Sequence, residues 1–137
     1  MSRVQLALNV TDIDAAVDFY GRLFGAEPAK RRPGYANFAI DQPPLKLVLI
    51  EAPEGGTINH LGVELADTAE VSVASERLVS SGLVPREEMG VECCYALQDK
   101  VWVSDPDGAP WEWYTVLEDS PVMVSTSPCC GEESSCC

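Results

Sequence analysis

Hydrophobic and polar residues alternate over the first ten positions of the chain. The aliphatic residues of this stretch are Val4, Leu6, Leu8 and Val10. A period of two predicts a strand with one aliphatic face, and Gln5 lies on the opposite face. The spacing then changes, because apolar residues recur every three or four positions over 13–24, after a cap at Thr11 or Asp12 and before a stop at Gly25. This second segment is predicted to be a helix.

The remaining segments predict more strands and a second helix. Strands are expected over 35–40, 45–51, 60–65, 92–98, 100–104 and 111–116. In the strand over 60–65, His60 lies on the face opposite the aliphatic residues. Asp67 and Glu70 form a capping-box pattern for a helix that runs to Gly82, and 105–108 has the composition of a tight turn.

The second half of the chain repeats the first. An offset of 55 residues places Gln5 on His60, and the last strands of the two halves align Lys46 with Glu112. We therefore predict an α+β fold of tandem βαβββ modules, in which equivalent residues of both halves surround one shared cleft. The expected boundaries are about 1–52 and 58–117 for the modules, 1–117 for the whole domain, and 118–137 for a flexible, cysteine-rich tail without periodic apolar residues.

The charge balance argues against two classes of partner. The 137 residues include 22 acidic and 9 basic ones, which give a net charge of −13 at pH 7. Such a chain is repelled by nucleic acid and by an anionic membrane surface. The first ten residues lack the pattern of a signal peptide, and no apolar run approaches the roughly 20 residues that span a bilayer. We expect a cytoplasmic protein.

All six cysteines occur as adjacent pairs. These are Cys93 with Cys94, Cys129 with Cys130, and Cys136 with Cys137. Neighbouring Cα atoms lie about 3.8 Å apart, which is short of the about 4.4–6.8 Å found in disulfides, so adjacent cysteines do not easily bridge each other. In a reducing cytosol such thiols suit soft cations. The alternatives are two buried core cysteines for the first pair and incidental solvated thiols for the other two pairs.

The sole histidine, His60, is the first candidate for a functional side chain. A lone histidine on a strand is more often structural, but here its repeat equivalent Gln5 offers an amide oxygen and Glu112 lies in the closing strand. Imidazole, amide oxygen and carboxylate together suit a borderline divalent metal. The fourth equivalent position, Lys46, is a cation, so such a metal would keep open coordination positions. The simpler alternatives are an exposed amide at Gln5 and a solvated carboxylate at Glu112.

The chain resembles the vicinal oxygen chelate superfamily, which includes glyoxalase I, extradiol dioxygenases and bleomycin resistance proteins. The duplicated βαβββ pattern and the segment WVSDPDGAPWEWY carry this resemblance. More closely, the segments RPGYANFAI, NHLGVE and ECCYALQDKVWV and the paired cysteines of the tail are similar to the arsenic-inducible C–As lyases and the related cadmium-induced proteins.

The resemblance implies an Fe(II)-dependent dioxygenase that uses O2 to cleave the carbon–arsenic bond of trivalent organoarsenicals such as methylarsenite. Carried over by position, Gln5, His60 and Glu112 are the metal ligands and catalytic centre, and Cys93 and Cys94 are the thiols that bind arsenic. Nickel, cobalt, copper or zinc can replace iron in a purified sample, because divalent affinities rise along the first row. Two other functions stay open: a non-catalytic cadmium or arsenite binder, and a metal-free protein that sequesters a drug.

Adjacent thiols pose a geometric problem, since neighbouring side chains of a regular strand point to opposite faces. We therefore expect a mobile loop over about 85–94 that closes over the cleft and brings both sulfurs to one arsenic atom. Lys100 is either an exposed charge or a residue that closes over the site. The tail cysteines are candidates for binding released arsenite or heavy metal, and a homodimer is left open.

Overall fold

The computed structural model describes residues 2–121. They form two modules, each with one strand, one helix and three further strands in that order. The first module contains β1 (Arg3–Val10), α1 (Ile13–Phe24), β2 (Lys30–Arg32), β3 (Tyr35–Ile40) and β4 (Leu45–Glu51). The second contains β5 (Thr57–Glu64), α2 (Thr68–Ser80), β6 (Arg86–Cys93), β7 (Ala96–Ser104) and β8 (Pro110–Asp119). The predicted α+β fold of tandem βαβββ modules is confirmed.

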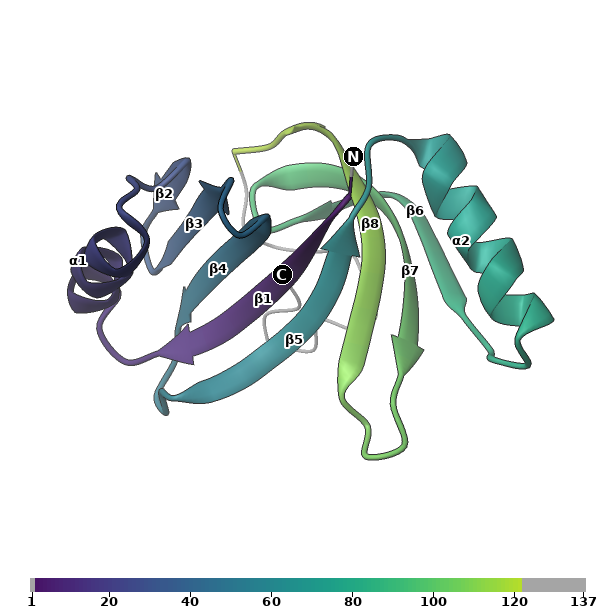
Figure 1. The fold of residues 1–137 in the computed structure, drawn as a ribbon, viewed down its shortest axis with the longest axis horizontal. Coiled ribbons are helices and arrows are strands. Elements are labelled where there is room, and N and C mark those ends of the chain that lie inside the picture. Colours follow the sequence, from purple (N-terminus) through teal and green to yellow (C-terminus); the bar gives the residue numbers. More distant parts are fainter. Residues whose placement is uncertain (1, 122–137) are drawn as a thin grey trace.

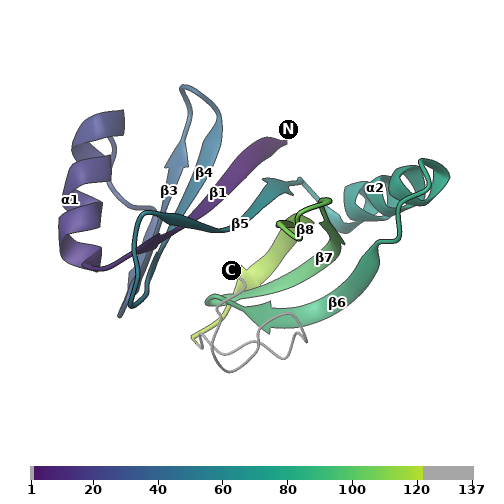
Figure 2. The same cartoon turned by 90° about the horizontal axis from the view of Figure 1, so that it is seen from below.

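All eight strands form one curled sheet in the order β2-β3-β4-β1-β5-β8-β7-β6. Within each module the first strand pairs in parallel with the last, and the modules join where β1 runs antiparallel to β5. Figures 1 and 2 show the two helices at opposite ends of this sheet, outside its curve. The curve therefore leaves a concave inner face, to which both modules contribute.

The alternation in β1 separates the core from the inner face. Leu6 and Leu8 pack into the hydrophobic cluster beneath α1, whereas Gln5 and Ala7 are buried on the other side of the strand. Asp12 caps the start of α1, since its side chain accepts a hydrogen bond from a backbone N–H of the first turn. Gly25 caps the end of α1 with left-handed backbone angles. A second cluster packs beneath α2 in the same way.

Two predicted boundaries differ in the structure. Residues 86–93 form strand β6, so the mobile loop expected over 85–94 is wrong for most of its length. Two of its acidic residues have partners: Glu88 is buried and accepts a hydrogen bond from the indole N–H of Trp102, and Glu87 accepts one from Ser75. Strand β8 also continues to Asp119, so residues 118 and 119 belong to the sheet and not to the tail.

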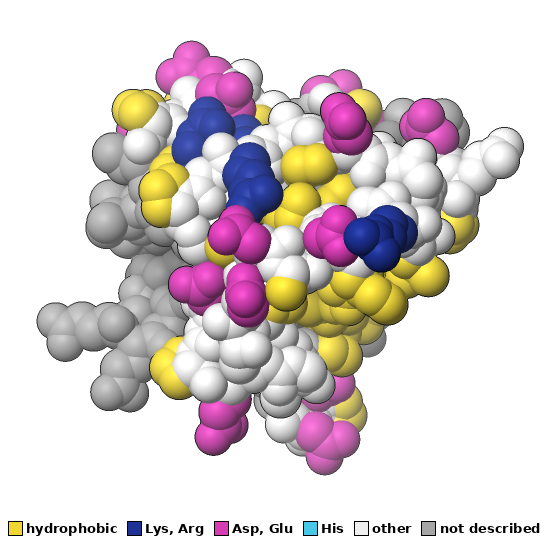
Figure 3. All heavy atoms as spheres, turned by 90° about the vertical axis from the view of Figure 1, so that its left-hand side faces the viewer, with side chains coloured by type: hydrophobic (Ala, Val, Ile, Leu, Met, Phe, Trp, Pro, Cys, Tyr) yellow, Lys and Arg dark blue, Asp and Glu magenta, His cyan; other side chains and the backbone are white. Residues whose placement is uncertain are grey.

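None of the helices within residues 2–121 has the length and apolarity needed to cross a membrane. The tail cysteines Cys129, Cys130, Cys136 and Cys137 lie outside the described residues. On the face over α1 and β2, acidic side chains are scattered and the basic ones lie next to them (Figure 3), as in the ion pairs of Arg31 with Asp14 and Arg22 with Asp18.

Candidate functional site

Three polar side chains from three different strands meet on the inner face. Gln5 Nε2 lies 2.8 Å from Glu112 Oε1 and 3.2 Å from His60 Nε2, and the last two atoms are 3.4 Å apart. All three residues are at most 3% exposed. The structure thus brings together the three side chains that the repeat and the resemblance select, and it excludes the exposed alternatives for Gln5 and Glu112.

The strand register explains this convergence. Gln5 and Glu112 are both paired with Gly62, from the two sides of β5, and His60 lies two residues before that glycine on the same face. A Cβ atom at Gly62 would lie 2.6 Å from the Glu112 carbonyl oxygen and 2.9 Å from its Cγ. A side chain at this position would therefore separate the two groups, so the glycine opens the space in which they meet.

The Glu112 carboxylate is buried but charged. Lys100 Nζ lies 2.9 Å from Glu112 Oε2 and is fully buried, so Lys100 is neither an exposed charge nor a cover over the site. Burial raises the pKa of Glu112, but the charges of Lys100 and His60 outweigh it and lower the pKa to about 2. At neutral pH the site therefore holds one carboxylate with one oxygen toward Lys100 and the other toward Gln5 and His60.

His60 directs its Nε2 atom at the same point. Its Nδ1 lies 2.7 Å from the side-chain oxygen of Asn59, an atom that can only accept a hydrogen bond. In a neutral imidazole the proton is then on Nδ1, and the lone pair of Nε2 is directed at Gln5 and Glu112.

A second polar chain runs behind Gln5. Its Oε1 accepts a hydrogen bond from the Tyr114 hydroxyl, which also lies 3.4 Å from Glu64 Oε2. Glu64 is in turn paired with Lys46 Nζ at 2.8 Å and with Arg3 Nε at 2.7 Å. Burial acts to raise the pKa of Glu64, but these two cations lower it below its ordinary value. Lys46, the repeat equivalent of Glu112, thus neutralises a carboxylate beside the site.

Cys93 and Cys94 lie at the turn between β6 and β7. Cys93 is the last residue of β6, while Cys94 and Tyr95 take left-handed backbone angles with φ of 52° and 64°. This turn ends the strand, so the two adjacent side chains are not forced to opposite faces, and their sulfurs lie 3.4 Å apart. Two thiolates that bind one tetrahedral soft ion at about 2.3 Å each lie about 3.7 Å apart. The pair therefore has the spacing of a bidentate thiol site.

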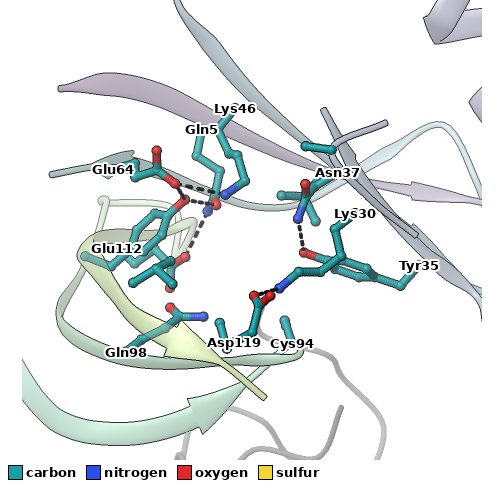
Figure 4. A pocket seen from close by; sticks show the side chains of 15 residues that line it. Gln5, Lys30, Tyr35, Asn37, Lys46, Glu64, Cys94, Gln98, Glu112 and Asp119 are labelled. Atoms are coloured by element: carbon teal, nitrogen blue, oxygen red, sulfur yellow. Dashed lines mark hydrogen bonds and ion pairs between the residues drawn. The ribbon is translucent and has the colours of Figure 1, made fainter. Parts of the chain in front are cut away.

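One cavity of about 280 Å³ lies between the polar cluster and the cysteine turn. Gln5, Glu112 and Cys94 all line it, and Figure 4 shows Gln5 directed toward Glu112, with Cys94 and Gln98 on the opposite wall. The Gln98 amide N–H₂ donates to the Cys93 carbonyl at 3.0 Å, while its buried oxygen has no hydrogen-bond partner within the described part of the chain. The cavity thus holds the buried carboxylate, a cysteine and one acceptor without a hydrogen-bond partner among the described residues.

Residues 3–113 match the sequence profile of the Glyoxalase/Bleomycin resistance protein/Dioxygenase superfamily. The chain belongs to this superfamily. Among solved structures, it is similar to the Mn(II)-bound glyoxalase from Novosphingobium aromaticivorans, with a TM-score of 0.61 and 21% identity over 90% of this chain and 43% of that one. The likeness confirms the fold of the superfamily, which includes metal-dependent enzymes.

Two kinds of relative within the superfamily cover the whole chain. The cadmium-induced protein CadI of Mycobacterium tuberculosis is 59% identical over 100% of this chain and 93% of its own length. The trivalent organoarsenical cleaving enzyme of Thermomonospora curvata is 55% identical over 100% of this chain and 89% of its own.

The three convergent side chains fit a metal ion of the kind that this superfamily binds. Three ligands about 2.1 Å from one ion and at right angles to one another lie about 3.0 Å apart. The atoms Gln5 Nε2, Glu112 Oε1 and His60 Nε2 are separated by a similar 2.8, 3.2 and 3.4 Å, and exchange of the two ends of the Gln5 amide would put its oxygen in the place of Nε2. No cluster of three His, Cys, Asp or Glu side chains occurs within residues 2–121, so a metal here needs the amide oxygen of Gln5 as a ligand. Metal binding by this set stays a prediction.

Sequence reasoning missed Tyr114, Glu64 and Gln98, which also face the site. Tyr114 lies two residues after Glu112, and Glu64 four residues after His60, so the period of two places each on the same strand face as the predicted ligand. That signal was present in the sequence. The sequence did not show that β5 pairs with both β1 and β8, and this pairing brings the strand faces together.

Proposed function

We propose that this chain is an Fe(II)-dependent dioxygenase that cleaves the carbon–arsenic bond of trivalent organoarsenicals such as methylarsenite, with arsenite as the inorganic product. The observation that carries the proposal is the single cavity shared by Gln5, Glu112 and Cys94, with His60 behind the first two. The name of the Thermomonospora curvata relative supports the same substrate class. All these groups come from one chain, so the site requires no second copy.

In the proposed site, Fe(II) is held by His60 Nε2, Glu112 Oε1 and the amide oxygen of Gln5. When bound, the metal supplies activation of dioxygen at its open positions. Glu112 contributes the negative charge, which Lys100 keeps on the carboxylate, and Asn59 keeps the Nε2 lone pair of His60 directed at the metal.

The thiols hold the substrate beside this centre. Trivalent arsenic is soft, so sulfur is its preferred ligand, and each thiol that replaces an As–OH group releases one water molecule. Two such bonds fix the arsenic atom against the cavity wall, next to the metal, which supplies proximity for the reaction. The cavity of about 280 Å³ suits a small organic group such as methyl.

A second candidate function is sequestration of cadmium or arsenite without catalysis. The 3.4 Å spacing of the two sulfurs suits any soft ion, and the relatives at 59% identity are named for induction by cadmium. In this case the thiols would bind the ion, and the three-residue site would have no role in turnover.

Incubation of the protein with methylarsenite in four mixtures, with and without Fe(II) and with and without air, separates the two functions. The enzyme should form arsenite only when both iron and oxygen are present, and in that mixture the His60→Ala variant should form it at least about a hundredfold more slowly. A binder would retain methylarsenite unchanged in all four mixtures, as measured by arsenic speciation after denaturation. Arsenite release that needs neither iron nor oxygen would contradict the proposed chemistry.

A further inference from the structure

The orientation of the Gln5 amide is critical for the proposed metal site. Only its oxygen has lone pairs for a cation, yet in the structure Nε2 faces Glu112 and His60 while Oε1 faces Tyr114. The two ends of an amide have nearly the same shape, so their hydrogen-bond partners decide which end points where. Metal binding therefore needs a partner on the Tyr114 side that can accept the amide N–H₂.

A hydroxyl can serve either end of the amide, as a donor to oxygen or as an acceptor from nitrogen. The hydroxyl can accept the amide N–H and still donate its own proton only if a second acceptor lies within reach of that proton. Glu64 Oε2, 3.4 Å from the Tyr114 oxygen, is that acceptor. Glu64 is itself paired with Lys46 and Arg3, and an ionised carboxylate accepts hydrogen bonds but cannot donate them.

We propose that Tyr114 and Glu64 form a positioning pair that directs the Gln5 amide oxygen toward the metal. When an ion occupies the site, the Tyr114 hydroxyl donates to Glu64 and accepts the Gln5 amide N–H, so the oxygen end faces the cation. This inference rests on the proposed metal site but adds two residues that act through Gln5 and touch neither metal nor substrate. Hydrogen bonds to the far side of a ligand typically change metal affinity by about 10–100-fold.

The test is a double-mutant cycle read by Co²⁺ binding in the absence of arsenical and oxygen. Tyr114→Phe removes only the hydroxyl and should weaken the Kd for Co²⁺ at least about tenfold. The same change should have an effect within about twofold in a Gln5→Glu background, because both ends of a carboxylate are oxygen and no orientation has to be selected. A merely structural role of Tyr114 would produce the same loss in both backgrounds, and that result would overturn the proposal.

Glu64→Gln provides a second cycle, which decides the matter if Tyr114→Phe does not fold. An amide at position 64 can donate to the Tyr114 oxygen, and the Tyr114 hydroxyl then donates to the Gln5 amide oxygen and holds it away from the metal. Glu64→Gln should therefore weaken Co²⁺ binding in the wild-type background. The same change should weaken it much less in the Gln5→Glu background. Tyr35→Phe is the matched control, because this buried tyrosine lines the same cavity but its hydroxyl accepts a hydrogen bond from Asn37. The Kd of Tyr35→Phe for Co²⁺ should stay at the wild-type value.

The outcomes separate this inference from the proposed function. Wild-type protein that binds no Co²⁺ would remove the metal site, and with it both proposals. Wild-type protein that binds Co²⁺ and, loaded with iron, cleaves methylarsenite would support the function. In that case an unchanged Kd in Tyr114→Phe and Glu64→Gln would overturn the positioning pair alone.

Discussion

The buried pair of Lys100 and Glu112 gives a prediction whose size follows from the structure. Lys100→Met keeps an unbranched side chain of similar length but leaves the Glu112 carboxylate without its nearest cation. The pKa of Glu112 is lowered from 4.5 to about 2, and one pKa unit corresponds to about 1.4 kcal/mol, so the charged form is stabilised by about 3 kcal/mol. Because His60 contributes part of this stabilisation, we expect Lys100→Met without metal to lose about 2–3 kcal/mol of unfolding free energy at pH 7 relative to the wild type.

Urea denaturation of metal-free protein measures this loss. Because the pKa of Glu112 is lower in the folded state, its contribution is complete above about pH 4.5 and is lost as the pH falls toward 2. The difference between wild type and Lys100→Met should therefore shrink over that range. Glu112→Gln in the Lys100→Met background should recover part of the stability, because no unpaired charge remains.

Lys30→Met is the matched control for the loss of a lysine. Lys30 Nζ lies 2.6 Å from Asp119, whose side chain is 74% exposed, so solvent screens this ion pair and it contributes little to stability. A loss in Lys100→Met as small as that in Lys30→Met, or one that does not change with pH, would refute the reasoning. Addition of a divalent metal should restore stability to Lys100→Met, because the ion supplies the missing positive charge.

Three other changes test separate parts of the structure. Cys93→Ser and Cys94→Ser should each weaken binding of trivalent arsenicals at least about tenfold without loss of metal, and retained affinity in both would return the pair to a core role. Gly62→Ala should cost about 1–3 kcal/mol and impair metal binding, which thermal unfolding and Co²⁺ titration measure together; wild-type values in both would contradict the close contacts. Truncation after residue 121 should preserve iron-dependent turnover, whereas truncation after Val116 should lower the melting temperature, because it removes the end of β8.

Much of the fold could be predicted because it depends on local pattern. The alternation in β1 and β5 assigned Gln5 and His60 to the inner face, and the 55-residue repeat predicted that two equivalent strands would meet. The repeat therefore carried information about tertiary structure that periodicity alone lacks.

Other features depend on partners that are distant in the sequence. Strand β6 contains an acidic, glycine-containing segment typical of a loop, but its Glu88 and Glu87 form hydrogen bonds with Trp102 and Ser75, which belong to other elements. The left-handed angles at Cys94 and Tyr95 occur at non-glycine residues, so no local signal marked the turn that places the two sulfurs together. The Lys100–Glu112 pair likewise requires the register of β7 against β8.

The most direct test of the central claim compares wild type with His60→Ala under iron and air. Both proteins retain the thiol pair, so both should bind methylarsenite with similar affinity in anaerobic dialysis. The wild type should then convert the bound methylarsenite to arsenite on exposure to oxygen, and His60→Ala should show at least about a hundredfold lower rate, since it lacks the imidazole of the proposed metal site. Equal rates of arsenite formation would contradict the account, because cleavage would then not depend on the site that Gln5, His60 and Glu112 form.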